Sequence, residues 1–362
     1  MTRLMPVLFT YFFKRFSGSI LAVFGLVAAL VFVLDLIELT RIANDASTHA
    51  LLTAAELALM RTPSVAEQVL PFAGLFGGLF GFLALAKSRE LVVARAAGTS
   101  VWQFIAPALI ASLVWGAFGT LALNPLSAAL KAQADAIMAH TDQNASSSKK
   151  KEIWLRQKSV DGEAILRADT ADLTTGDFKG ITAFEFDKSG QFIHRVVADK
   201  GRLDDGVWIL TEAKVLSPGS PPETHETYEL STFLTKEQVR QSLSAPDTIS
   251  VYALPGWARA TEAAGLDATH YRQQFQSLMA RPALLAAMIL IAATVSLRFS
   301  RTGVSIGSIL GGVAAGFALY VANKISGDFG GNGLLNPIFA SFMAPALGGL
   351  ICTLILLYLE DG

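Results

Sequence analysis

Six apolar stretches, separated by charged segments, run along this chain and predict six membrane-spanning helices. A helix needs roughly 20 mostly apolar residues to cross a bilayer. The fourth stretch is the shortest because Arg281 and Arg298 bound it, and we expect Arg281 to extend toward the lipid headgroups. The predicted spans cover residues 16–34, 68–86, 101–123, 282–297, 302–323 and 335–358.

Between the third and fourth spans the pattern changes to short alternating stretches with glycine-containing turns between them. Short strands at such spacing predict an antiparallel domain, a sandwich or a jelly roll. Two helices follow, and the second is expected to run directly into the fourth span. The β-prone stretches are 153–155, 164–166, 181–186, 192–197, 207–210 and 228–233, and the helices are 257–265 and 267–279.

The predicted fold class is therefore a polytopic α-helical membrane protein of six transmembrane helices with an inserted β-jellyroll-like domain. Spans one to three occupy residues 1–130, the β domain occupies 131–272, and spans four to six occupy 273–362. Small-residue faces in spans two and five, rich in glycine, predict close helix packing.

Composition supports this division. The chain is 52% hydrophobic and only 16% charged, against roughly a quarter charged in soluble domains. Residues 131–272 hold 38 of the 59 charged side chains. A net charge of −1 gives no reason to expect nucleic acid. The single cysteine, Cys352, excludes a disulfide within the chain and a cysteine cluster for zinc.

Orientation follows from the positive-inside rule. With six spans both termini lie on one side, and that side would hold eight basic residues against two or three in the short loops opposite. We therefore expect an inner-membrane protein with cytoplasmic termini and a periplasmic central domain. The eight are Arg3, Lys14, Arg15, Lys87, Arg89, Arg95, Arg298 and Arg301.

No catalytic motif is visible. The histidines are dispersed without ligand spacing, and the chain contains neither a Gly-x-Ser-x-Gly elbow nor a phosphate-binding Gly-x-x-x-x-Gly-Lys-Ser/Thr loop. The chain is thus not itself an ATPase of that type, and we predict no catalytic or metal-ligating residue.

The loop after the second span, residues 85–100, is short, basic and amphipathic. It sets topology by charge alone, or it forms an interfacial helix that presents Glu90 to a cytoplasmic protein. Leu91, Val92 and Val93 are unusual in a plain turn and favour the helix. The string Ser-Arg-Glu-Leu-Val-Val, followed by Ala97 and Gly98, resembles the coupling helix of the LptF/LptG permeases of the lipopolysaccharide exporter. The resemblance extends to the order of spans and β domain.

The resemblance implies a set of partners. Such a permease pairs with a sister permease, binds two copies of the ATPase LptB, and passes lipopolysaccharide to a periplasmic bridge that begins with LptC. The string and the early Trp154 are more similar to the LptG form of the family, for which the sister would be LptF; for a chain of the LptF form the sister would be LptG. This chain would hold no cofactor, since the partner ATPase binds ATP and magnesium. The implied coupling residues are Lys87, Arg89, Glu90, Leu91 and Gly98, and Glu90 would meet the ATPase.

Charged residues near the outer ends of the spans are candidates for contact with a lipid headgroup. Asp35, Glu38 and Arg41 share one side of the first helix. They form an interfacial salt-bridge set, or they line a site in which Arg41 contacts phosphate. The family carries more basic residues here, which weakens the transfer except at Arg41. Lys324 is a second headgroup candidate, with an interfacial anchor as the alternative, and Glu67 is expected to be interfacial.

Alternation gives each strand two faces, and we predict that one set of apolar residues lines a lipid groove. An ordinary sealed core is the alternative for each of them. The spacing requires a register shift or bulge if the phenylalanines and Ile193 are to share a face. The set is Trp154, Ile165, Phe184, Phe186, Ile193, Val197, Trp208 and Leu210.

Two other functions remain open at this point. A lipoprotein-release or mechanotransmission-type permease also works with an ATPase, but such proteins have four spans. A membrane-anchored periplasmic binding or sensor protein would need no coupling loop.

Overall fold

A computed structural model describes most of the chain. The described residues are 4–43, 48–88, 90, 100–142, 153–158, 162–172, 177–187, 191–204, 206–232, 248–263, 267–302 and 306–361. They fall into two compact units. The first comprises Met1–Ile137, Asp247–Pro255 and Thr269–Gly362, and the second comprises Met138–Pro246 and Gly256–Ala268.

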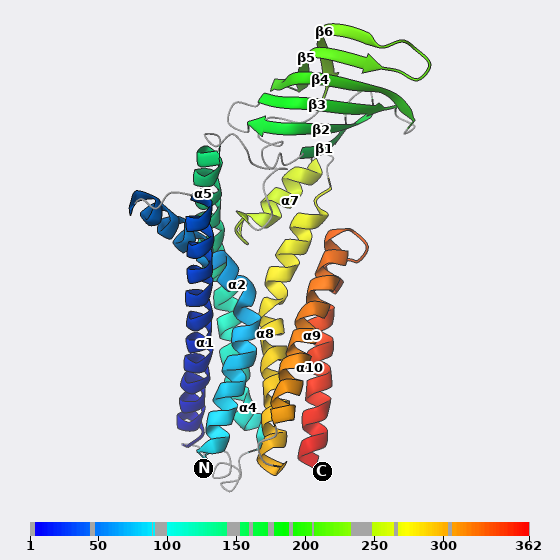
Figure 1. The fold of residues 1–362 in the computed structure, drawn as a ribbon. Helices are drawn as coiled ribbons and strands as arrows, with labels where there is room; N and C mark the ends of the chain where they lie inside the picture. The colour runs from blue at the N-terminus through cyan, green and yellow to red at the C-terminus, as the bar shows by residue number, and fades with distance from the viewer. Residues whose placement is uncertain are drawn as a thin grey trace. The chain divides into compact units, whose positions relative to one another are not determined.

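The first unit is a helix bundle (Figure 1). Among the described residues, six helical segments are long and apolar enough to cross a membrane, as predicted, and each of the six hydrophobic stretches falls largely within one of them. The helices are α1 (Leu4–Ala43), α2 (Thr48–Lys87), α4 (Val101–Phe118), the π-helix η1 (Gly119–Leu123), α5 (Asn124–Asp142), α8 (Thr269–Thr302), α9 (Ile306–Gly331) and α10 (Pro337–Asp361).

The helices are longer than the predicted spans. Both α1 and α2 have 40 residues, about 60 Å at 1.5 Å per residue, which is twice the thickness of the hydrocarbon layer. Charged residues limited the predicted spans, but a helix continues through them because its backbone bonds do not depend on side-chain polarity. For the same reason α8 joins the helix expected at 267–279 to the fourth span, and Arg281 lies inside it.

Aromatic side chains and glycines hold the bundle together. Phe12 meets Phe104 with ring centroids 4.8 Å apart, and Phe16 meets Phe82 at 4.6 Å. On α2, a Cβ at Gly77 would lie 2.7 Å from the backbone Cα of Ile20 on α1. The absence of a side chain at Gly77 therefore sets how closely α1 and α2 approach, which agrees with the predicted role of these glycines in helix packing.

The second unit contains an antiparallel sheet of six strands. The strands are β1 (Ile153–Lys158), β2 (Glu163–Asp172), β3 (Asp177–Phe186), β4 (Phe192–Asp204), β5 (Val207–Leu216) and β6 (Glu223–Ser231). Each of the six predicted stretches contributes to a strand, although the last, 228–233, extends past the end of β6 at Ser231. Each neighbour in the sheet is also the neighbour in sequence. Among the described strands this is a meander in one sheet, without the crossing connections of a jelly roll. A helix, α7 (Leu254–Ala263), follows in the chain.

Partway along β3, β4 and β5, at the same level in each strand, the buried side chains switch from one face of the sheet to the other. This level defines a line across the three strands. On β4, Val196 and Ala198 are buried on one side of this line and Gly201 and Leu203 on the other, so the alternation shifts by one residue. Gly180 on β3 and Glu212 on β5 have positive φ angles of 65° and 56° at the same level. The strand segments before and after this line therefore bury their apolar side chains in the same core. One sheet thus supplies both of the layers that enclose this core.

We predict that Gly77→Ala weakens the bundle. The new methyl group would meet the backbone of Ile20, and overpacking of this kind costs roughly 1–3 kcal/mol. Thermal unfolding of the purified chain in detergent should show a lower midpoint. Gly25→Ala on α1 is the matched control, because nothing lies within 4 Å of a Cβ there. Equal midpoints for the two variants would contradict this account of the α1–α2 contact.

Candidate functional site

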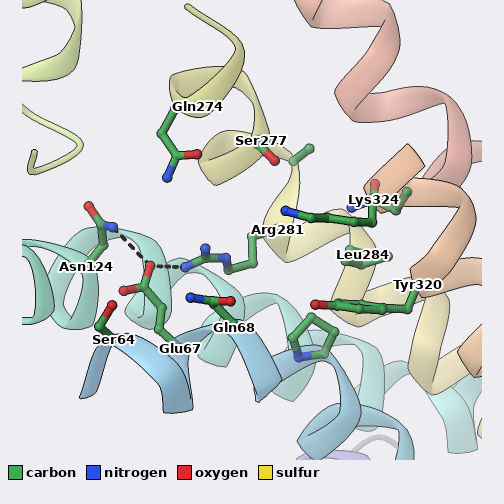
Figure 2. Close-up of a pocket in the computed structure, with 13 residues that line it drawn as sticks. Ser64, Glu67, Gln68, Asn124, Gln274, Ser277, Arg281, Leu284, Tyr320 and Lys324 are labelled. Atoms are coloured by element: carbon green, nitrogen blue, oxygen red, sulfur yellow. Dashed lines mark hydrogen bonds and ion pairs between the residues drawn. The ribbon is translucent and has the colours of Figure 1, made fainter. Parts of the chain in front are cut away.

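A polar pocket of about 290 Å³ lies within the helix bundle. Figure 2 shows side chains of α2, α5, α8 and α9 converging on it. It is lined by Ser64, Glu67, Gln68, Pro71, Asn124, Gln274, Ser277, Ala280, Arg281, Leu284, Tyr320, Asn323 and Lys324. Ten of these thirteen side chains are polar, which is unusual in so apolar a bundle and marks the pocket as the candidate site.

A buried carboxylate organises one wall of the pocket. Glu67 is only 5% exposed. Its Oε1 accepts a hydrogen bond from Asn124 Nδ2 at 3.0 Å and forms an ion pair with Nη1 of Arg281 (Figure 2). Its Oε2 accepts a hydrogen bond from the hydroxyl of Ser127. Three donors thus satisfy the carboxylate, as a charge outside water requires.

The local backbone brings these groups together. The π-helix η1 ends directly before Asn124. The backbone N–H of Asn124 donates to the carbonyl of Gly119, five residues earlier. A π-turn contains one residue more than an α-turn, so it changes the face on which the following side chains lie. The hydroxyl of Thr120 also donates to the carbonyl of Leu278 at 2.8 Å, which fixes this turn against α8.

The opposite wall carries positive charge. Lys324 on α9 has no hydrogen bond or ion pair with any described residue, and its side chain, like that of Tyr320, extends toward α8 in Figure 2. Arg281 bonds Glu67 through Nη1. A guanidinium has five N–H donors, so Arg281 retains donors for a ligand. Two cations and one internal carboxylate leave the pocket with a net positive charge, which suits an anion.

The structure corrects two expectations. Glu67 was expected to be interfacial but is buried among protein side chains. Arg281 was expected to extend toward the headgroups, but it turns inward to Glu67. In both cases the partner lies inside the bundle, as is usual for charged groups at membrane depth.

The other headgroup candidates lie elsewhere. Asp35, Glu38 and Arg41 lie on α1 and do not line the pocket. No ion pair joins these three to one another among the described residues. Asp35 has one buried carboxylate oxygen for which the described chain offers no partner. Of the predicted contacts, only Lys324 lies in the pocket.

The structure describes two of the five predicted coupling residues. Lys87 ends α2 and is exposed, and Glu90 is helical and half-buried. A carboxylate oxygen of Glu90 lies 3.9 Å from Nη1 of Arg15 on α1. Arg89, Leu91 and Gly98 lie outside the described residues, as does the side chain of Trp154.

The remaining seven groove candidates do not share one environment. Trp208 and Leu210 are 0% exposed in the core of the sheet, whereas Ile193 is 41% exposed. Ile165, Phe184, Phe186 and Val197 are half-buried. The pairing of β3 and β4 shifts register between Glu185 and Phe186, where the spacing required a bulge.

Polar side chains also form a cluster in the second unit, which contains the sheet. His194 bonds the hydroxyl of Tyr228 at 2.8 Å, and that hydroxyl donates to Glu185 at 3.1 Å. Three strands contribute one residue each, so the cluster links β6 to β3 and β4. Among the described residues, no group of three or more histidine, cysteine, aspartate or glutamate side chains is arranged to hold a metal ion.

Fold and site together define a class: a multi-pass membrane protein with an inserted sheet domain and a cationic pocket among its spans. Residues 10–358 match the family model for the lipopolysaccharide export system permease LptF/LptG. The chain belongs to this family.

Curated relatives point the same way. The lipopolysaccharide export system permease protein LptG of Escherichia coli K12 is 23% identical over 337 residues, which cover 89% of each chain. The protein of the same name from Haemophilus influenzae is 22% identical over 332 residues, which cover 88% of this chain and 89% of the relative.

We predict that Glu67→Leu destabilises the bundle more strongly than Glu67→Leu/Arg281→Leu does. The single change leaves Arg281, itself only 16% exposed, without its carboxylate, and loss of one partner of a buried pair costs about 3–5 kcal/mol. An apolar pair in the same place is often neutral. Denaturant unfolding of both variants in detergent measures the difference. Additive losses in the double variant would show that the two residues act independently.

Proposed function

We propose that this chain is the permease subunit of an ATP-driven exporter that takes lipopolysaccharide out of the inner membrane and passes it toward the outer membrane. Family membership supports the role, and the cationic pocket is the structural observation that carries it. Lipopolysaccharide bears phosphate on its headgroup, and Arg281 and Lys324 supply the charge-assisted donors that phosphate requires. The chain itself is non-catalytic in this proposal, and a partner binds ATP and magnesium.

The depth of the pocket fits this role. We place both termini in the cytoplasm and the β domain in the periplasm, as the basic loops indicate. Glu67 precedes the end of α2 by 20 residues and Lys324 follows the start of α9 by 18, which puts each about 27–30 Å from the cytoplasmic helix ends. That is roughly the thickness of the hydrocarbon layer. The pocket therefore lies at the level of the outer-leaflet headgroups.

The proposed partners are a sister permease, two LptB ATPases and LptC with its periplasmic bridge, and we assign this chain the LptG role beside LptF. Helix α1 supports a neighbour in the membrane, since only 6% of its most apolar window is buried within the chain. Gly18 and Gly25 on α1 have nothing within 4 Å of a Cβ position, and such sites allow another helix to approach closely.

We predict that Glu90→Ala uncouples the ATPase. Glu90 lies near Arg15 at the cytoplasmic end in this assignment, and a carboxylate there is positioned to pair with a basic group of the partner. ATP-driven release of lipopolysaccharide from proteoliposomes should fall at least about tenfold, the effect of 1.4 kcal/mol. Glu56→Ala, an exposed acid at the other end of α2, should leave release unchanged. Normal release and normal complex yield with Glu90→Ala would remove the coupling role.

We predict that only the accessible groove candidates contact lipid. Keeping one CH₂ group of an acyl chain out of water stabilises it by about 0.8 kcal/mol. Acyl chains that cross an aqueous space therefore need an apolar surface to cover them. A photo-crosslinking residue at Ile193 or Phe184 should form ATP-dependent adducts with lipopolysaccharide in the reconstituted complex. The same residue at Trp208, fully buried in the core, should form none. Adducts absent at both accessible positions, with the ATPase active, would favour a sheet that serves as a sealed core.

A further inference from the structure

Asn124 uses both ends of its side-chain amide. Its Nδ2 donates to Glu67 Oε1 at 3.0 Å, and its Oδ1 accepts from the backbone N–H of Val251 at 2.9 Å. The residue is only 3% exposed. One side chain therefore connects the wall of the pocket to a backbone segment 127 positions away in sequence.

That segment is a short anchor of the chain on the bundle. Residues 247–255 belong to the first unit, although the residues on both sides of them in sequence belong to the second. Ile249, Val251 and Leu254 are 6% exposed or less. The hydroxyl of Tyr252 donates to the carbonyl of Leu121 in the π-helix at 2.9 Å. The anchor thus holds the chain to the bundle between two passages through the sheet-containing unit.

One oxygen joins the anchor to the ligand site. Glu67 Oε1 accepts from both Asn124 and Arg281 (Figure 2). An anion in the pocket attracts Arg281 and so weakens its bond to this oxygen. The carboxylate then depends more on its neutral donors, Asn124 among them. A stronger bond to Nδ2 restricts the amide and holds Oδ1 in place for Val251.

We propose that Asn124 is a positioning residue that links occupancy of the pocket by a phosphate-bearing lipid to the anchoring of residues 248–254. This inference rests on the proposed function, because it takes the pocket as the phosphate site. It adds a consequence of binding: the lipid tightens the point at which the chain returns from the sheet-containing unit to the membrane.

Hydrogen–deuterium exchange of the full permease complex in nanodiscs tests the link. Backbone amides of 248–254 are followed with and without purified lipopolysaccharide in the discs, and binding is measured in parallel. In the wild type, exchange of the Val251 amide should slow at least about threefold with the lipid, because exchange reports local opening. In Asn124→Leu, exchange should be fast and should not change with lipid, at lipid concentrations that saturate this variant in the parallel binding measurement.

Tyr252→Phe is the matched control. It removes the bond to Leu121 but keeps the path through Asn124, so exchange should be faster overall while the lipid still slows it. If Asn124 had only a structural role, exchange in Asn124→Leu would be faster than in the wild type, and the lipid would still slow it. If Asn124→Leu does not fold, Asn124→Asp takes its place, because its carboxylate keeps an acceptor for the Val251 N–H but has no N–H to donate to Glu67. Lipid-dependent slowing of exchange in that variant would overturn the link.

The outcomes separate this inference from the proposed function. If lipopolysaccharide binds and the wild-type segment does not respond, or if Asn124→Leu keeps the response, the link through Asn124 is wrong and the function stands. If lipopolysaccharide does not bind the wild-type complex, the proposed function fails and this inference fails with it.

Discussion

A carboxylate buried among protein side chains constrains the centre of this bundle. Glu67 needs its donors from the protein, and they come from two other helices: Arg281 on α8, and Asn124 and Ser127 on α5. An uncompensated charge in an apolar surrounding costs several kcal/mol, far more than any single packing contact. The relative positions of α2, α5 and α8 are therefore tied together at one point. The pocket lies beside that point, and Arg281 and Glu67 both line it.

The hydrophobic pattern was sufficient for the architecture. Long apolar runs and alternating short ones have different periods, so six spans and six strands could be located from residues alone. The same pattern underestimated the lengths of the helices, because most of the predicted spans were ended at a charged residue. A charge such as Arg281 ends a span only if it faces lipid or water, and which face it takes depends on packing that periodicity does not contain.

The site was predictable only in part. Lys324 was visible as a cation directly after an apolar run. The pairing of Glu67 with Arg281 joins residues 214 positions apart, and no local pattern reports such a distance. One signal was available: Glu67 and Arg281 directly precede the second and fourth predicted spans, which start on the same side of the membrane in the predicted topology, and opposite charges at membrane depth generally pair. Asn124 carried no signal, because its importance comes from a π-turn that the composition of Gly119–Leu123 does not reveal.

In the β domain, the predicted alternation holds on either side of the line across β3, β4 and β5 but not through it. Leu210 and Ala213 are both buried on β5 although an odd number of positions separates them. A pattern with a strict period of two assigns such residues to opposite faces. The structure separates Trp208 and Leu210, which are buried in the core, from Ile193, which is 41% exposed.

The π-helix has a consequence for how such chains diverge. Each residue in an α-helix advances the direction of the side chain by about 100°, so the extra residue of η1 acts as a phase correction that aims Asn124 at Glu67. Loss of one residue from this turn would leave the hydrophobicity of the third span almost unchanged, yet it would rotate everything after it out of alignment. Insertions and deletions that a loop absorbs are thus excluded from these five positions, and in comparisons among relatives this short stretch should keep its length even where its residues differ.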